Sequence, residues 1–156
     1  MRKLNLGCGG DIRQDFINCD VRKLQGIQLR CDIEHNHLPF KDSVFDEVLA
    51  KDVIEHVSFR RVETLLKEIH RILKVKGKVI IQTPDFEQIV RKWQEGKIKG
   101  WWQISYWLYG AQDYPENTHK LIFTKSELKN LLEQIGFEVF SIENDNTNFI
   151  CEAIKK

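Results

Sequence analysis

The chain has 156 residues, with 24 basic and 23 acidic side chains and a net charge of +1. This length fits one domain, and the balanced charge argues against a dedicated binder of nucleic acid or of anionic membranes. No run of about 20 apolar residues occurs, so we expect no membrane-spanning helix. We expect a cytoplasmic protein, because a strand at the start leaves no room for a signal peptide and the four scattered cysteines fit buried thiols in a reducing compartment.

Short apolar runs predict the strands of the first half of the chain. They lie at 4–6, 16–21, 27–33, 45–51 and 78–83. Only Cys8–Asp15 separate the first two strands, which is too short for a full crossover helix. We therefore expect a shortened first helix of a turn or two at most.

Two longer helices and a closing hairpin complete the predicted elements. Apolar residues at helical spacing predict a helix over about 58–73, ended by a left-handed Gly77. A second helix, over 124–135, begins with the capping-box pair Thr124 and Glu127. The runs 137–143 and 148–154 flank a turn-forming stretch and predict an antiparallel hairpin. The fold class expected is α/β: a Rossmann-like, doubly wound, mixed sheet of seven strands.

A glycine-rich turn follows the first strand directly, at Gly7-Cys8-Gly9-Gly10. Such a turn exposes backbone N–H groups and lets a ligand approach the main chain. Asp20 ends the second strand, where a carboxylate can accept hydrogen bonds from a ribose diol. These features predict a nucleoside-bearing cofactor at the carboxyl edge of the sheet. NAD and FAD fit poorly, because Ile12 stands where the dinucleotide fingerprint needs a third glycine and Asp20 comes too early.

The ordered set of motifs resembles the class I S-adenosylmethionine-dependent methyltransferases, and most closely their small type 11-like subgroup. The matching stretches are 4–10, 18–20, 31–33, 38–48, 53–57 and 68–78. Two departures are the shortened first helix and Val75, which replaces the proline common in the Lys-Pro-x-Gly turn. The resemblance implies one methyltransferase domain over 1–156.

The resemblance also implies the cofactor and its contacts. S-adenosylmethionine would bind here and leave as S-adenosylhomocysteine. Asp20 would bind the ribose and Asp32 the adenine amine. The alternative role of Asp20 is that of a turn acid at the end of a strand, and the alternative role of Asp32 is to cap the following loop. The implied cofactor-binding residues are Leu6, Gly7, Cys8, Gly9, Gly10, Asp20, Val21, Asp32, Ile33, Lys51, Asp52 and Val53.

An aromatic-rich insertion at about 86–123 holds all four tryptophans and all three tyrosines. In related methyltransferases this region covers the acceptor pocket. The alternative is a small core or a homodimer contact through 93–114. His119 is the predicted general base and Asp113 a weaker candidate, while a hydrogen bond that holds the lid is the other role for His119.

The expected reaction is methyl transfer to a small-molecule or glycan-like acceptor. The motif Asn/Asp-Pro-Pro-Tyr is absent after the fourth strand, where Lys51-Asp52-Val53-Ile54 stands, which argues against methylation of DNA adenine or glutamine. The alternative is a cofactor-binding scaffold without catalysis, with the tryptophan-rich segment as its interface.

No metal site is predicted. The chain lacks the zinc-binding pattern His-Glu-x-x-His, and the neighbours Glu55 and His56 would point to different sides of a helix. His35 and His37 lie on a polar stretch, where solvated side chains are the ordinary outcome.

Overall fold

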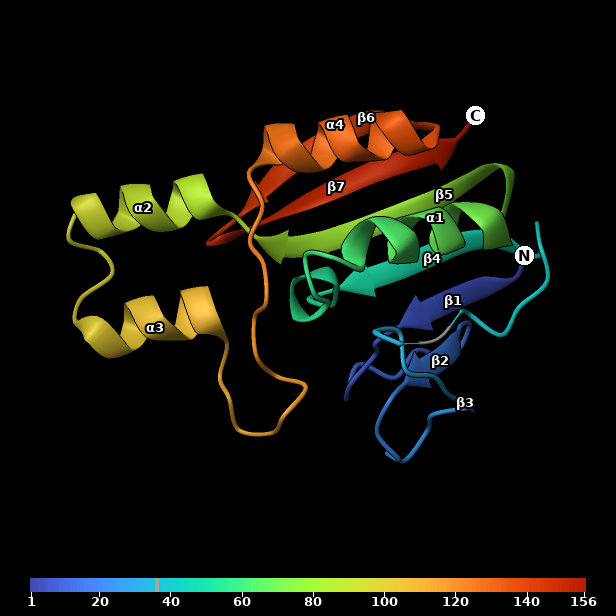
Figure 1. Ribbon diagram of the computed structural model, residues 1–156, viewed down its shortest axis with the longest axis horizontal. Coiled ribbons are helices and arrows are strands. Elements are labelled where there is room, and N and C mark those ends of the chain that lie inside the picture. The colour runs from blue at the N-terminus through green and yellow to red at the C-terminus, as the bar shows by residue number, and fades with distance from the viewer. Residues whose placement is uncertain (36) are drawn as a thin grey trace.

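A seven-stranded sheet organises the molecule in this computed structural model, which describes residues 1–35 and 37–156. The strand order is β3-β2-β1-β4-β5-β7-β6 (Figure 1). Strands β1 to β5 run parallel, whereas β7 is antiparallel to both β5 and β6. This confirms the predicted α/β fold with its antiparallel closing hairpin. The strands are β1 (Lys3–Leu6), β2 (Ile17–Asp20), β3 (Leu29–Arg30), β4 (Phe45–Lys51), β5 (Leu73–Pro84), β6 (Phe137–Asp145) and β7 (Asn148–Lys155).

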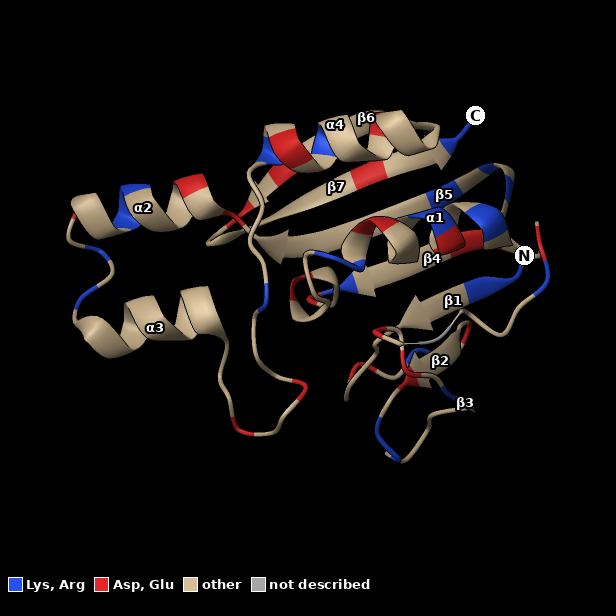
Figure 2. Cartoon of the chain, in the orientation of Figure 1, with Lys and Arg blue, Asp and Glu red and all other residues tan. Residues whose placement is uncertain are grey.

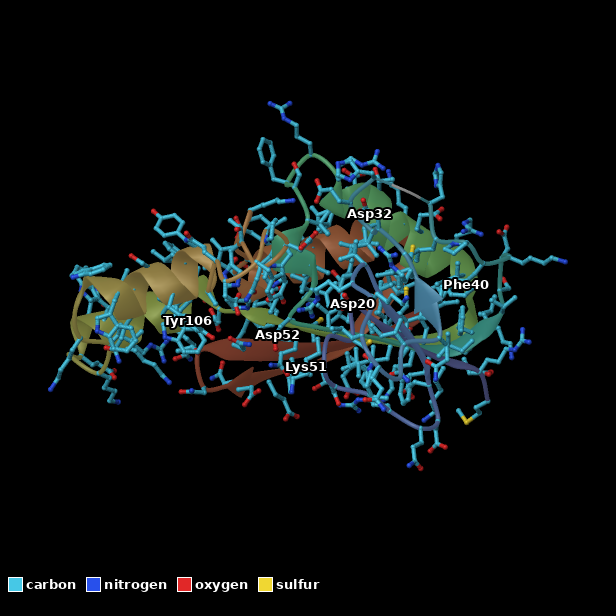
Figure 3. All side chains as sticks on the ribbon, turned by 90° about the horizontal axis from the view of Figure 1, so that it is seen from below. Asp20, Asp32, Phe40, Lys51, Asp52 and Tyr106 are labelled. Atoms are coloured by element: carbon cyan, nitrogen blue, oxygen red, sulfur yellow. The ribbon has the colours of Figure 1, made fainter. Side chains whose placement is uncertain are left out.

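Two helices cover one face of the sheet. These are α1 (Val62–Ile72) and α4 (Lys125–Ile135), and in Figures 1 and 3 both lie on the same side of the strands. Helix α4 begins with the predicted capping box and ends at Gly136 in the left-handed conformation, as expected. The hydrophobic core lies beneath these helices, where apolar residues of alternate strand positions are fully buried.

The opposite face has no helix among those that the structure describes, and turns replace the shortened first helix. Two buried asparagines hold these turns against β1 and β2. Asn5 Nδ2 donates to the Asp11 carbonyl at 2.7 Å and to Asn18 Oδ1 at 3.1 Å. Asn18 Oδ1 accepts the Arg13 N–H at 3.0 Å, and its Nδ2 donates to the Arg13 carbonyl at 2.9 Å. Side-chain amides thus satisfy backbone groups that a helix would otherwise satisfy internally.

Several predicted boundaries are wrong. The third strand extends only over Leu29–Arg30, because the Asp32 carboxylate accepts the N–H groups of Glu34 and His35 and turns the chain out of the sheet. The first long helix ends at Ile72, within one residue of the predicted end, but it begins at Val62 and not at 58. Leu73 is fully buried in extended backbone and begins β5, five residues before the predicted start of that strand at 78. The left-handed residue is Lys76, whereas Gly77 is needed because a Cβ there would lie 2.8 Å from the Lys74 carbonyl oxygen.

The helices α2 (Phe86–Gln94) and α3 (Trp101–Tyr109) extend from one end of the sheet (Figure 1). Asp85 caps α2 by accepting the N–H groups of Glu87 and Gln88. None of the helices in the described part of the chain has both the length and the apolar character that a membrane span requires.

Glu68 ties α1 to the loop before β4, and its replacement should weaken the fold. It accepts the Leu38 N–H at 3.0 Å and pairs with Arg71, which lowers the pKa of Glu68 to about 2. We expect Glu68→Gln to lose about 2 kcal/mol of unfolding free energy at neutral pH, a usual value for hydrogen bonds to charged groups. Because the folded-state pKa is depressed, this loss should be complete above the ordinary pKa of 4.5 and should fade as pH falls toward 2.

Urea unfolding at several pH values measures this effect. Glu63→Gln, on the same helix but with an exposed side chain paired only to Lys67, is the matched control and should change stability by less than about 0.5 kcal/mol. Equal losses in the two variants would contradict the assigned role of Glu68.

Candidate cofactor site

A cleft of about 760 Å³ opens where the parallel strands end. In Figure 3, Asp20, Asp32, Lys51 and Asp52 lie in the middle of the molecule, between Tyr106 of α3 and Phe40. The ends of β1, β2 and β4 and the loops after them supply most of the lining. Ligands of open α/β sheets bind at such an edge, where the strand order reverses beside the first strand.

The glycine turn forms the floor of the cleft. Gly7 and Gly9 have φ angles of +61° and +51°, which residues with a Cβ rarely adopt. A Cβ on Gly7 would also lie 2.7 Å from Val53 Cγ2, so the close approach of the loop after β4 requires glycine. Cys8 is buried, and this burial together with the nearby Asp20 raises the pKa of its thiol to about 11, which leaves it protonated and poorly nucleophilic at neutral pH.

Asp20 accepts three hydrogen bonds in the cleft. Its Oδ2 accepts the Gly9 N–H at 2.8 Å, and its Oδ1 accepts both the backbone N–H of Arg22 at 2.9 Å and the Arg22 Nε–H at 3.2 Å. The Arg22 guanidinium also lies 4.2 Å from the ring centroid of Tyr114, which belongs to the loop after α3. The contact between Arg22 and Tyr114 was not predicted from the sequence. The two residues are 92 positions apart and belong to no common motif.

Two further acids reach the cleft from other loops. Asp32 binds its own loop, with Oδ2 at 3.0 Å from His35 Nδ1, and the hydrogen bonds from His35 and the backbone lower its pKa against the effect of burial. Asp52 adopts a positive φ of 52° directly after β4 and accepts a hydrogen bond from Asn148 Nδ2 at 2.7 Å. Strained backbone of this kind often occurs at functional sites.

Eleven of the twelve predicted cofactor-binding residues line this cleft, and Leu6 does not. Leu6 is fully buried in the core, because side chains of successive strand residues point to opposite faces. The two predicted catalytic residues also lie outside the lining. Asp113 accepts a hydrogen bond from Asn117 Nδ2 at 2.6 Å, and the His119 ring lies against His56. Burial and His56 lower the pKa of His119 to about 4.

Glu55 and His56 do not diverge as expected. They lie in η1 (Ile54–His56), a single 3₁₀ turn, and their ligand atoms lie within 4.8 Å of one another and of a His119 nitrogen. The Lys120 N–H donates to the Glu55 carbonyl at 2.7 Å, which holds the segment that contains His119 beside η1. A 3₁₀ turn and a contact across 63 residues are both invisible to motif spacing.

Residues 4–81, which are half of the chain, match the family of methyltransferase domains. The chain belongs to this family. It is a methyltransferase domain, and solved structures that share its fold include proteins described as S-adenosylmethionine-dependent methyltransferases. The sequence-based recognition of the family is thereby confirmed.

The chain is also similar to individual proteins and solved structures. An uncharacterized protein of Methanocaldococcus jannaschii is 33% identical over 90 residues, which are 58% of this chain and 37% of that protein. The demethylmenaquinone methyltransferase of Lactobacillus johnsonii is 29% identical over 140 residues, which are 83% of this chain and 57% of that enzyme. A solved S-adenosylmethionine-dependent methyltransferase from Mesorhizobium loti has the same fold, with a TM-score of 0.68, 18% identity, and coverage of 99% of this chain and 90% of that one. The methyltransferase domain spans only about a third to about half the length of the two curated relatives.

The residues present fit S-adenosylmethionine. The cleft offers the Asp20 carboxylate at the end of β2, a glycine turn at which a ligand can approach the backbone, and a second acid, Asp32, beyond β3. Asp20 Oδ2 accepts one hydrogen bond from the protein and retains capacity for a hydroxyl donor.

Proposed function

We propose that the chain transfers a methyl group from S-adenosylmethionine to a small-molecule or glycan-like acceptor. The observation that carries the proposal is the cleft in which the glycine turn and Asp20 meet at the carboxyl ends of β1 and β2. The sulfonium supplies an activated methyl group when it is bound, so the protein has to align the donor with the acceptor and exclude water.

The predicted contacts divide the cofactor between two strand ends. Asp20 would accept the ribose hydroxyls, since its two oxygens lie beside the glycine turn. Asp32 would accept a hydrogen bond from the adenine amine, because its carboxylate uses three of about four acceptor positions on its own loop. The backbone of Gly7 and Gly9 would approach the methionine and ribose parts.

The acceptor would enter from the side of the aromatic insertion, which we propose as a lid over 86–123 within a single domain. Tyr114, Asn117 and Lys120 of its last loop line the cleft. His119 and Asp113 remain the predicted catalytic candidates. A base with a pKa of about 4 is weak, however, so His119 alone would not remove the proton of an unactivated acceptor.

Calorimetric titration with S-adenosylhomocysteine tests the proposal, with NAD as the control ligand. We expect micromolar binding of the first and none of the second, followed by methyl transfer from labelled cofactor in a screen of small acceptors. A chain that binds neither ligand would leave the non-catalytic scaffold as the better account.

A cytoplasmic location stays a prediction.

A second candidate function is association through the aromatic segment 93–114. Helix α3 has no buried residue and no charged residue (Figure 2), and the side chain of Trp101 is 81% exposed. Exposed apolar faces of this kind are typical of interaction surfaces, and we propose a homodimer through it.

Trp101→Glu should therefore convert the protein from dimer to monomer. A charge on this face would have to be buried without a partner in the interface, which costs several kcal/mol. Light scattering coupled to gel filtration measures the mass directly. Phe59→Glu is the matched control. The side chain of Phe59 is exposed as well, at 66%, but it follows η1 and does not belong to α3. A wild-type monomer at all concentrations would refute the dimer.

A further inference from the structure

Three side chains with metal-binding atoms meet beside the cleft. Glu55 and His56 come from η1, and His119 comes from the loop before α4. One ligand atom from each lies within 4.8 Å of the other two, and the two imidazole rings pack edge to face with centroids 5.0 Å apart. The arrangement joins segments that are distant in sequence, so it is a product of the fold and not of a local motif.

Both histidines are held in one orientation by backbone carbonyls. His56 Nδ1 lies 3.2 Å from the Thr118 carbonyl oxygen, and His119 Nδ1 lies 3.1 Å from that of Trp107. A carbonyl only accepts, so each Nδ1 carries the proton and each Nε2 keeps its lone pair. A hydrogen bond of this kind from the remote ring nitrogen is the usual outer-shell support of a metal-binding histidine.

Glu55 is a buried acid without a cation. Its side chain is 1% exposed, and Oε2 accepts a hydrogen bond from Thr83 Oγ1 at 3.1 Å. In the described part of the chain it forms no ion pair. A buried carboxyl is stabilised by a partner of opposite charge, and a metal ion held between Glu55 and the two imidazoles would supply that charge.

We propose that Glu55, His56 and His119 bind a divalent transition-metal ion at the edge of the cofactor cleft. Two imidazoles and one carboxylate form a ligand set that suits zinc, iron or manganese and leaves coordination positions open. Calcium and magnesium prefer ligands that are all oxygen. Ligand atoms about 2.1 Å from a tetrahedral ion lie roughly 3.4 Å from one another. The three ligand atoms lie within 4.8 Å here, so the side chains would move closer together when the ion binds.

The location gives the ion a chemical role that rests on the proposed methyl transfer. His56 lines the cofactor cleft, so an open coordination position would lie where an acceptor hydroxyl can reach it. The ion would lower the pKa of that hydroxyl, whose proton leaves to water. The oxygen would then form a bond to the methyl carbon as the carbon–sulfur bond breaks, which yields S-adenosylhomocysteine. The acceptor class is therefore a hydroxyl-bearing small molecule.

Titration of the full chain with Co²⁺, followed by visible absorption, tests the site, with Zn²⁺ calorimetry as a second measurement. We expect saturable binding of one ion per chain. Glu55→Gln keeps an oxygen that can accept the hydrogen bond from Thr83. This variant and His119→Ala should each weaken Co²⁺ binding by roughly 100-fold, because even replacement of a residue that only supports a ligand weakens metal binding by about 10–100-fold. His37→Ala, which removes an exposed histidine beside Glu68, is the control and should bind Co²⁺ as the wild type does.

Binding of S-adenosylhomocysteine by the same proteins separates the two proposals. Wild-type protein that binds S-adenosylhomocysteine but no Co²⁺ would overturn the metal site alone. Protein that binds Co²⁺ but no S-adenosylhomocysteine would overturn the proposed function alone. Unchanged Co²⁺ affinity in Glu55→Gln and His119→Ala, with their circular dichroism spectra intact, would also overturn the site.

Discussion

Asp20→Ala should weaken binding of S-adenosylhomocysteine by roughly 100-fold. The variant removes the proposed acceptor of two ribose hydroxyls, and a hydrogen bond to a charged group contributes about 1.5–3 kcal/mol. A 100-fold change corresponds to about 2.8 kcal/mol, which lies within the range for the loss of such a pair. The same carboxylate also accepts the Gly9 N–H, so part of the effect would come from a loosened glycine turn.

Calorimetry measures the affinity, and two further variants isolate the cause. Asp20→Asn keeps an oxygen for the Gly9 N–H but loses the charge, so it should lie between wild type and Asp20→Ala. Asp15→Ala removes an exposed acid outside the cleft and should bind as the wild type does. If Asp20→Ala bound S-adenosylhomocysteine as tightly as the wild type, the ribose assignment would be wrong.

Gly7→Ala should destabilise the fold by about 3 kcal/mol. The positive φ of Gly7 costs a residue with a Cβ about 1 kcal/mol, and the contact of that Cβ with Val53 adds an overpacking cost of about 1–3 kcal/mol. For a chain of this size each kcal/mol lowers the melting temperature by about 2–4 °C. We therefore expect a drop of roughly 6–12 °C, together with loss of cofactor affinity.

Gly96→Ala separates the two costs. Gly96 has a similar φ of +68°, but a Cβ there would meet no atom within 4 Å, so this variant carries the backbone cost alone. Thermal unfolding of both variants gives the difference, which we assign to Val53. Equal melting temperatures would show that the loop after β4 moves aside at no cost.

Local sequence patterns predicted those helices and strands whose ends are determined by residues at the ends themselves. The capping box at Thr124 and Glu127 fixed one helix start, and the closing hairpin followed from two apolar runs around a turn. The start of β5 at Leu73 could not be predicted, because burial of Leu73 in the core decides it and no local pattern marks it.

The residues of the site that lie at strand ends were predictable from the sequence, whereas the contacts made by distant loops were not. Gly7, Asp20 and Asp32 lie at strand ends or within two residues of them, so their motifs indicate the cleft from sequence order alone. Arg22 and Tyr114 meet only because the loop after α3 returns over the cleft. His119 was interpreted by the ordinary pKa of histidine, whereas its burial beside His56 sets a much lower one.

The bridge from Asp20 through Arg22 to Tyr114 makes the two sides of the cleft thermodynamically linked. A ribose diol that engages both Asp20 oxygens would take the Oδ1 position now held by Arg22 Nε–H. The guanidinium would then be released from its position over the Tyr114 ring, and with it an anchor of the loop on the acceptor side. Linkage is reciprocal, so any acceptor that displaces Tyr114 would strengthen cofactor binding by the same factor. Binding of either ligand would therefore prepare the cleft for the other, whichever binds first.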